Sequence, residues 1–274
     1  MKLKLAFSTC PNDTFMFHAM VHKLVHTGNY NFEINLMDIE ELNEQAAQQI
    51  NDISKISINA YGQLSEHYQL LSSGAALGFG NGPLIISKHK IYPDELADAK
   101  MAIPGFKTTA NLLLESLFPE VQNKKAYLFS DIEEAVLSGE TDAGLIIHET
   151  RFSFHKKGLL KVADLGEVWE EKIKLPLPLG GIAIRRDLDK NVKEDIQSII
   201  AQSVKFAMIN PKASLPYVKN HAQDLDEEVM KQHIDLYVND YSINIKSDGK
   251  SAIEYLVKEA ARINQKQLTQ PIFL

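Results

Sequence analysis

Short runs of alternating hydrophobic and polar residues recur along the chain, each followed by a longer segment with helical apolar spacing. The first such run contains Leu3, Leu5 and Phe7. Alternation with a period of two predicts a half-buried strand, whereas apolar residues spaced three and four apart predict a helix. We expect strands at residues 2–8, 32–36, 53–57, 68–72, 83–87, 100–104, 125–129 and 182–184, and one ending at His148.

The helical segments lie between these strands and fill the end of the chain. Asn12 or Asp13 is a candidate N-cap for the first helix, and Pro211 is typical of a helix start. We expect helices at about 13–25, 39–49, near 59, after 109, from 130 or 131 to 138, and then at about 191–209, 211–221, 226–237 and 249–263.

Alternating strands and helices indicate the α/β class with mostly parallel sheets. A middle block at residues 97–182 is bracketed by segments with other neighbours. We therefore expect two lobes: a larger discontinuous lobe from residues 1–96 and 183–274, with a helical C-terminal tail, and a smaller α/β lobe from 97–182. This is the architecture of a two-lobe type 2 periplasmic-binding-protein-like fold with an interlobe cleft.

Composition narrows the possible partners. The chain has 274 residues and a formal net charge of −7, which argues against binding to nucleic acid or to an anionic membrane surface. Its one cysteine, Cys10, permits no intrachain disulfide. His18 and His22 lie four residues apart but lack the glutamate of a zinc-protease helix, so we expect partly exposed helix residues there and no metal.

The N-terminal residues have two lysines but no apolar run of signal-peptide length before Cys10. No segment approaches the length of a membrane span. We therefore expect a cytoplasmic protein; its oligomeric state is left open.

Candidate chemistry begins at His148. The stretch Asp142–Arg151 is a short apolar strand that ends in an imidazole, a carboxylate and a guanidinium. Ligands of open α/β folds bind beyond the carboxyl ends of strands, and histidine serves as a general base near neutral pH. Position alone is equally compatible with a histidine that only caps the strand. Glu149 and Arg151 alternate away from His148 and are left outside the site.

Three loops, at residues 8–14, 55–59 and 105–109, each follow a strand and open a helix. Helix N-termini bind carboxylates and phosphates through unpaired N–H groups. Simple N-capping explains any one of these loops, but three of them beside a strand-end histidine favour an anion-binding cleft. The possible cleft residues of the first loop are Asn12, Asp13 and Thr14.

Two further segments carry weaker signals. The glycine-rich run Gly78–Gly82 lacks the spacing of a nucleotide-binding loop. We interpret its glycines as serving the backbone conformation near the crossing between lobes. Trp169 either borders the cleft or lies on a solvated helical turn.

Several runs together resemble one enzyme family. They are Ser8–Phe15, Lys55–Ser57, Gly78–Pro83, Gly105–Thr109, Ala143–Phe152, Asp164–Gly166, Trp169–Glu171, Leu175–Gly181, Tyr237–Asn239 and Pro271–Leu274. In this order they are similar to the 1,4-dihydroxy-6-naphthoate synthases of the futalosine route to menaquinone. The resemblance covers essentially the whole chain.

The resemblance implies a lyase that converts cyclic de-hypoxanthine futalosine, a small carboxylated molecule, to 1,4-dihydroxy-6-naphthoate by breaking a carbon–carbon bond. It implies no cofactor and no metal. His148 matches the proton acceptor of the family. The substrate-contacting stretches match Lys55, Ile56, Ser57, Thr108 and Thr109.

Two other functions remain open. A solute-binding protein of the same fold would bind without chemistry, but the expected lack of a signal peptide and the presence of His148 count against it. A chorismate-dehydratase-like sibling enzyme is the second alternative, although the Cys-Pro-Asn-Asp-Thr turn and the His-Glu strand end fit the naphthoate synthases better.

Overall fold

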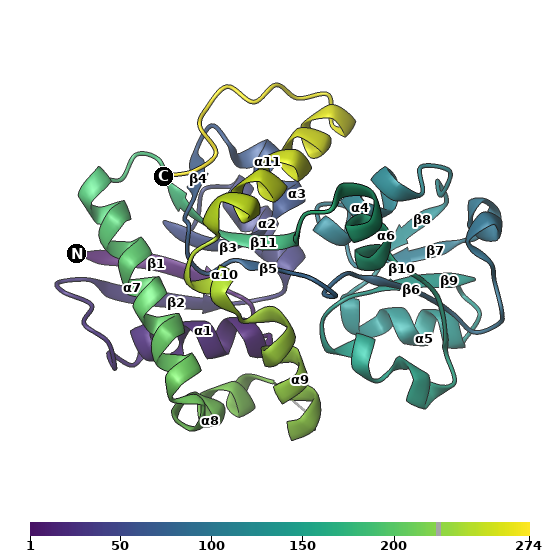
Figure 1. Cartoon of the computed structure of the whole chain (residues 1–274), viewed down its shortest axis with the longest axis horizontal. Coiled ribbons are helices and arrows are strands. Elements are labelled where there is room, and N and C mark those ends of the chain that lie inside the picture. The colour runs from purple at the N-terminus through teal and green to yellow at the C-terminus, as the bar shows by residue number, and fades with distance from the viewer. Residues whose placement is uncertain (223–225) are drawn as a thin grey trace. The chain divides into compact units, whose positions relative to one another are not determined.

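The computed structural model describes residues 1–222 and 226–274 of the chain (Figure 1). The chain divides into two compact units. The first contains Met1–Gly78 and Pro178–Leu274, and the second contains Phe79–Leu177.

A mixed sheet forms the centre of the first unit. Its strand order is β2 (Asn31–Leu36), β1 (Lys2–Phe7), β3 (Ile53–Ser57), β11 (Leu177–Arg185) and β4 (Tyr68–Leu70), with β5 (Ala76–Gly78) paired to β11. β1 runs parallel to β2 and β3, whereas β11 runs antiparallel to β3 and β4. The sheet is therefore less parallel than predicted, because β11 enters it from the returning chain rather than after a crossover helix.

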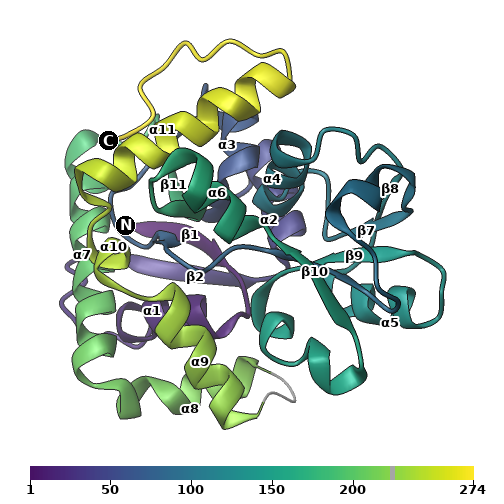
Figure 2. The same cartoon turned by 45° about the vertical axis from the view of Figure 1, so that its right-hand side comes forward.

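Helices cover both faces of this sheet. They are α1 (Pro11–Val21), α2 (Ile39–Ala47), α3 (Ile58–Leu64), α7 (Lys190–Ile209), α8 (Pro211–His221), α9 (Glu227–Tyr237), α10 (Asp240–Ile243) and α11 (Lys246–Ile263). One buried cluster joins β1, β3 and β11 to α1, α7, α8 and α9, while α3 packs against α11 on the other side (Figure 2). The predicted helices at 191–209 and 211–221 are confirmed to within one residue.

α1 is buried along nearly its whole length, with Pro11 to Met20 all inside. It begins at Pro11 with Cys10 as its N-cap, so the prediction of Asn12 or Asp13 as N-cap was wrong. Proline at the first helical position fixes the start, since its φ already suits a helix.

The expectation of a partly exposed His18 was also wrong. This side chain is buried, and its Nδ1 lies 3.0 Å from the Ser214 hydroxyl. Burial, aided by the nearby His22, lowers the pKa of His18.

The second unit has its own mixed sheet, in the order β10 (Leu160–Asp164), β6 (Leu84–Ser87), β9 (Ala143–Ile146), β7 (Met101–Ile103) and β8 (Lys124–Ala126). β7 runs parallel to β8 and β9, and β6 runs antiparallel to β9 and β10. Its α-helices are α4 (Thr109–Leu117), α5 (Ile132–Leu137) and α6 (Leu165–Ile173), and short 3₁₀ turns include His148–Phe152.

The border between the units differs from the predicted one. Residues 79–96 lie in the second unit rather than with residues 1–78, because β6 is hydrogen-bonded between β9 and β10. The glycine-rich run Gly78–Gly82 does contain the first crossing, as expected. The strand β10 and the helix α6 were not predicted.

Trp169 lies on α6 with 1% of its surface exposed, and its indole N–H donates to the Leu175 carbonyl at 2.9 Å. The alternative of a solvated helical turn is therefore wrong. This helix was missed in the sequence because the glutamates at 167, 170 and 171 make the segment look solvent-exposed, although its apolar residues face inward.

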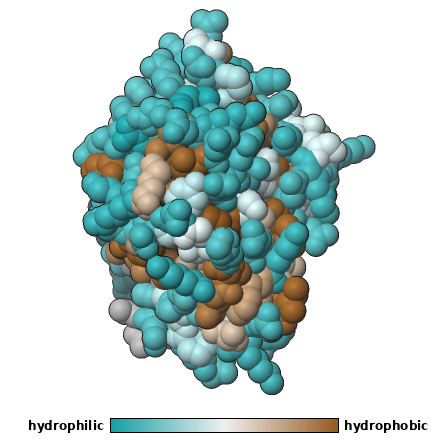
Figure 3. Space-filling model, turned by 90° about the vertical axis from the view of Figure 1, so that its left-hand side faces the viewer, coloured by the Kyte–Doolittle hydropathy of each residue, from teal (hydrophilic) through white to brown (hydrophobic). Residues whose placement is uncertain are grey.

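No helix within residues 1–222 and 226–274 is both long and apolar enough to cross a membrane. The face of the molecule shown in Figure 3 is largely hydrophilic, with hydrophobic side chains gathered in separate patches.

Candidate functional site

In the first unit, the first turn of α1, which follows β1, meets the end of β3. β1 and β3 are neighbouring parallel strands, so their carboxyl ends lie at the same edge of the sheet. There the Lys55 ammonium contacts the Asp13 carboxylate, with 2.8 Å between Nζ and Oδ1. The two side chains are 5% and 2% exposed. Two of the three loops singled out in the sequence are thus joined by a buried ion pair.

Asp13 holds more than this lysine. Its Oδ2 accepts from the Ser8 hydroxyl at 2.7 Å and from the Ser8 N–H at 3.3 Å, and its Oδ1 also accepts from the Asn12 amide at 2.9 Å. The Thr14 hydroxyl instead donates to the carbonyl of Cys10 at 3.0 Å. The side chains of Asn12 and Asp13 are thus bonded to each other, to Ser8 and to Lys55, whereas Thr14 bonds to the backbone that precedes it.

A side chain of α2 holds the last residue of β3, Ser57. The Asn43 side chain accepts from the Ser57 N–H at 2.9 Å and donates to the Ser57 hydroxyl at 3.1 Å. Ile56 is fully buried, as its alternation predicted. Asn43 was not singled out in the sequence, because its 14-residue separation from Ser57 leaves no local signal.

In the second unit, the loop after β7 opens α4. Gly105 has a φ of 137°, a left-handed value that glycine adopts without strain. Thr108 is the N-cap: its hydroxyl donates to the Gly105 carbonyl at 2.8 Å and accepts from the Asn111 N–H at 3.3 Å. Thr108 and Thr109 are 2% and 3% exposed. The capping interpretation of this loop is thus confirmed, and a substrate contact stays a prediction.

His148 follows β9, which runs parallel to β7, so this residue and the α4 loop lie at the same edge of the second sheet. Its φ is 59°, in the left-handed region. For a residue with a Cβ this conformation costs on the order of 1–2 kcal/mol and is concentrated at functional sites. The Phe129 ring meets the imidazole edge to face, with 5.0 Å between centroids. Phe129 had no sequence signal, since 19 residues separate it from His148.

Each unit therefore gathers one group of the predicted residues. The first unit brings the end of β3, with Lys55, Ile56 and Ser57, beside residues 12–14 at the start of α1, and the second brings His148 to the same sheet edge as Thr108 and Thr109. Buried polar side chains at strand ends that are fixed by hydrogen bonds from neighbouring residues are typical of a preorganised binding site.

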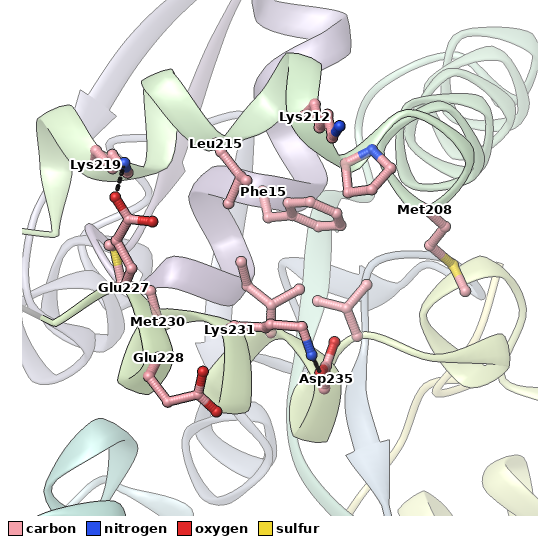
Figure 4. A pocket seen from close by; sticks show the side chains of 13 residues that line it. Phe15, Met208, Lys212, Leu215, Lys219, Glu227, Glu228, Met230, Lys231 and Asp235 are labelled. Carbon is pink, nitrogen blue, oxygen red and sulfur yellow. Dashed lines mark hydrogen bonds and ion pairs between the residues drawn. The ribbon is translucent and has the colours of Figure 1, made fainter.

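A separate hollow of about 470 Å³ lies between α8 and α9 of the first unit (Figure 4). Its floor is apolar, and two ion pairs, Lys219–Glu227 and Lys231–Asp235, lie on its rim. None of the predicted site residues lines it. The lining side chains include Phe15, Met208, Leu215, Met230, Ile234 and Val238. This hollow therefore combines an apolar floor with charged side chains, and it lies apart from the predicted site residues.

Comparison with known proteins gives a family. Residues 3–262 match the model of a family described as menaquinone biosynthesis. A 1,4-dihydroxy-6-naphthoate synthase of Thermus thermophilus is 40% identical over 258 residues, which cover 94% of this chain and 93% of that protein. The corresponding enzyme of Streptomyces coelicolor is 38% identical over 264 residues, again 94% and 93% of the two chains.

Solved structures agree on the fold. Protein AF1704 of Archaeoglobus fulgidus has a TM-score of 0.90 and 38% identity, covering 96% of this chain and 98% of its own. The alkanesulfonate-binding protein SsuA of Xanthomonas axonopodis pv. citri, bound to MOPS, has a TM-score of 0.72 at 13% identity, covering 100% and 96%. The predicted α/β fold of the periplasmic-binding-protein type is confirmed.

Proposed function

The chain belongs to the menaquinone-biosynthesis family, and from that premise we propose that it is a 1,4-dihydroxy-6-naphthoate synthase. The observation that carries the proposal is its 40% identity to the Thermus thermophilus enzyme over nearly the full length of both chains. The solute-binding proteins of similar fold support the architecture alone, because their identity is far lower.

The proposed reaction converts cyclic de-hypoxanthine futalosine to 1,4-dihydroxy-6-naphthoate and releases a small fragment of the former sugar. Removal of a proton supplies the electron pair whose movement breaks a carbon–carbon bond. Aromatisation to a naphthalene diol pulls the sequence forward. Such a reaction requires a positioned base, donors for the substrate carboxylate and stabilisation of a developing enolate.

We assign the base to His148, whose neutral imidazole would accept the proton. Support comes from its position after β9, its left-handed backbone and the packing of its ring against Phe129. A well-placed general base contributes about 10²–10⁴-fold to the rate. Stabilisation of the enolate and exclusion of water would supply the remainder.

We assign substrate contacts to Lys55, Ile56, Ser57, Thr108 and Thr109. The start of α4 supports this assignment, because N–H groups at a helix N-terminus favour a carboxylate. The ion pair with Asp13 fixes the Lys55 ammonium, and Asn43 fixes Ser57. Groups held in this way bind a ligand with little loss of side-chain entropy.

The proposal is tested by incubating the purified, metal-free protein with cyclic de-hypoxanthine futalosine and following dihydroxynaphthoate by mass spectrometry. The variant His148→Ala is run beside it, with calorimetry to measure substrate binding. We expect product from the wild type only, and substrate binding by both proteins.

Other outcomes separate the alternatives. Binding by the wild type without product would favour a solute-binding protein, and neither binding nor product would make chorismate the next substrate to test. Near-wild-type turnover by His148→Ala would remove this residue as the base and leave the reaction in place.

A further inference from the structure

The turn that carries His148 needs an external support. A residue with a Cβ in the left-handed region persists only where its surroundings fix it. Within the turn, the Thr150 hydroxyl donates to the Ile147 carbonyl at 2.6 Å. That bond lies beside His148 but anchors the turn to nothing outside it.

Besides the packing of the Phe129 ring against the imidazole, the turn contacts the rest of the unit through Arg151, three residues after His148. Its Nη1 donates to the Gly82 carbonyl at 2.7 Å, and its Nη2 lies 3.4 Å from Oδ2 of Asp164. The side chains of Arg151 and Asp164 are 12% and 7% exposed. A guanidinium offers planar donors in a fixed fork, so two acceptors on different segments hold it in one orientation.

The two acceptors lie on segments of the second unit that are packed closely against each other. The other carboxylate oxygen of Asp164 caps α6, accepting from the N–H groups of Gly166 at 2.8 Å and Glu167 at 3.2 Å. Gly82 and Gly166 approach so closely that a Cβ on Gly82 would lie 2.1 Å from the Gly166 nitrogen. The Leu165 N–H adds a bond to the Pro83 carbonyl at 2.9 Å.

We propose that Arg151 is a positioning residue, which anchors the turn to the Gly82 carbonyl and the Asp164 carboxylate and so aims the His148 imidazole. The inference rests on the proposed function, in which His148 is the base. Arg151 itself touches no reacting atom. Its loss lets the turn relax from the left-handed conformation and shifts the imidazole, and a shift of about 1 Å costs on the order of 100-fold in rate.

The test compares kcat and KM of Arg151→Met, Arg151→Lys and the wild type. Methionine keeps the length of the side chain but donates nothing, while lysine keeps the charge and lacks the planar fork. We expect Arg151→Met to lower kcat about 10- to 100-fold with KM within about threefold, and Arg151→Lys to lie between it and the wild type. Arg262→Met is the control, since Arg262 pairs with Glu259 at the end of α11 through a side chain that is 68% exposed, and it should keep wild-type kcat.

A purely structural role predicts another result. Arg151→Met would then lose soluble protein or thermal stability, while kcat per folded molecule, scaled by circular dichroism, stayed at the wild-type value. That result would overturn the inference. Should Arg151→Met not fold, a wild-type kcat in Arg151→Lys would overturn it equally.

A crystal structure of the folded variant separates this inference from the proposed function. We expect the His148 φ to leave the left-handed region or its imidazole to move. An unchanged turn would refute the positioning role, even if the wild type formed no naphthoate. Absence of product from the wild type, by contrast, would refute the reaction and leave the anchoring of the turn to be decided by that structure.

Discussion

The buried ion pair between Lys55 and Asp13 allows us to predict how much a substitution lowers the free energy of unfolding. The variant Asp13→Asn keeps the size of the side chain but removes the charge that faces Lys55 at 2.8 Å. Both side chains are almost fully buried, and the nearest other acceptor for the ammonium is the Gly74 carbonyl at 3.5 Å. Removing one partner of such a pair costs about 3–5 kcal/mol, because the remaining charge stays buried.

We expect the free energy of unfolding to fall by about 3 kcal/mol, near the lower end of this range. The reason is that asparagine keeps an oxygen that still accepts from Ser8 or Asn12. Unfolding in urea at pH 7, followed by far-ultraviolet circular dichroism, measures it. With a urea dependence of about 3 kcal/mol per molar, the midpoint falls by about 1 M. The matched control is Asp235→Asn, which removes an exposed ion pair of the same 2.8 Å length from α9 and should leave the midpoint nearly unchanged.

The double variant Asp13→Asn with Lys55→Met tests the reason for the loss. Removing both charges should cost clearly less than the sum of the two single changes, because the second substitution removes the unpaired ion that the first one leaves. A single-variant loss below about 1 kcal/mol, with additive effects in the double variant, would refute the argument.

Three further predictions concern binding, pH and packing. Ser57→Ala and Thr108→Val should each raise the dissociation constant of the substrate more than they lower kcat, and unchanged constants by calorimetry would contradict those contacts. Burial lowers the pKa of His18 below 6.5, so the folded state resists its protonation and stability should fall as pH drops through 6.5. His18→Gln should show a smaller decrease in urea midpoint between pH 7.5 and 5, and an equal decrease would exclude His18 as the cause. Gly82→Ala should prevent stable folding of the second unit, because its Cβ would lie 2.1 Å from the Gly166 nitrogen, and wild-type thermal stability would contradict this.

Sequence patterns captured the elements whose signals are local. The strand at 53–57 and the helix at 211–221 have the predicted bounds, since a short run rich in isoleucine and a proline at the helix start are properties of neighbouring residues. The antiparallel entry of β11 and the transfer of β6 to the second unit were missed, because strand pairing depends on distant segments.

The site shows the same limit. His148 and the helix-opening threonines stand out by position along the chain. The left-handed turn and the role of Arg151 do not, because the acceptors on Gly82 and Asp164 lie 69 and 13 residues away. Alternation pointed Arg151 away from His148, and the 3₁₀ turn at His148–Phe152 invalidates that pattern, since the strand has already ended at Ile146.

The central strand of the first sheet has a consequence for synthesis on the ribosome. β11 lies between β3 and β4, yet it is made only after the chain of the second unit has been synthesised. All five strands of the second unit, in contrast, lie within one uninterrupted stretch of chain. Domains generally fold as they are translated, so the second unit should fold first while the edges of β3 and β4 wait unpaired. A released chain that ends at Leu177 is thus expected to hold one folded unit and one sheet with an open gap between β3 and β4.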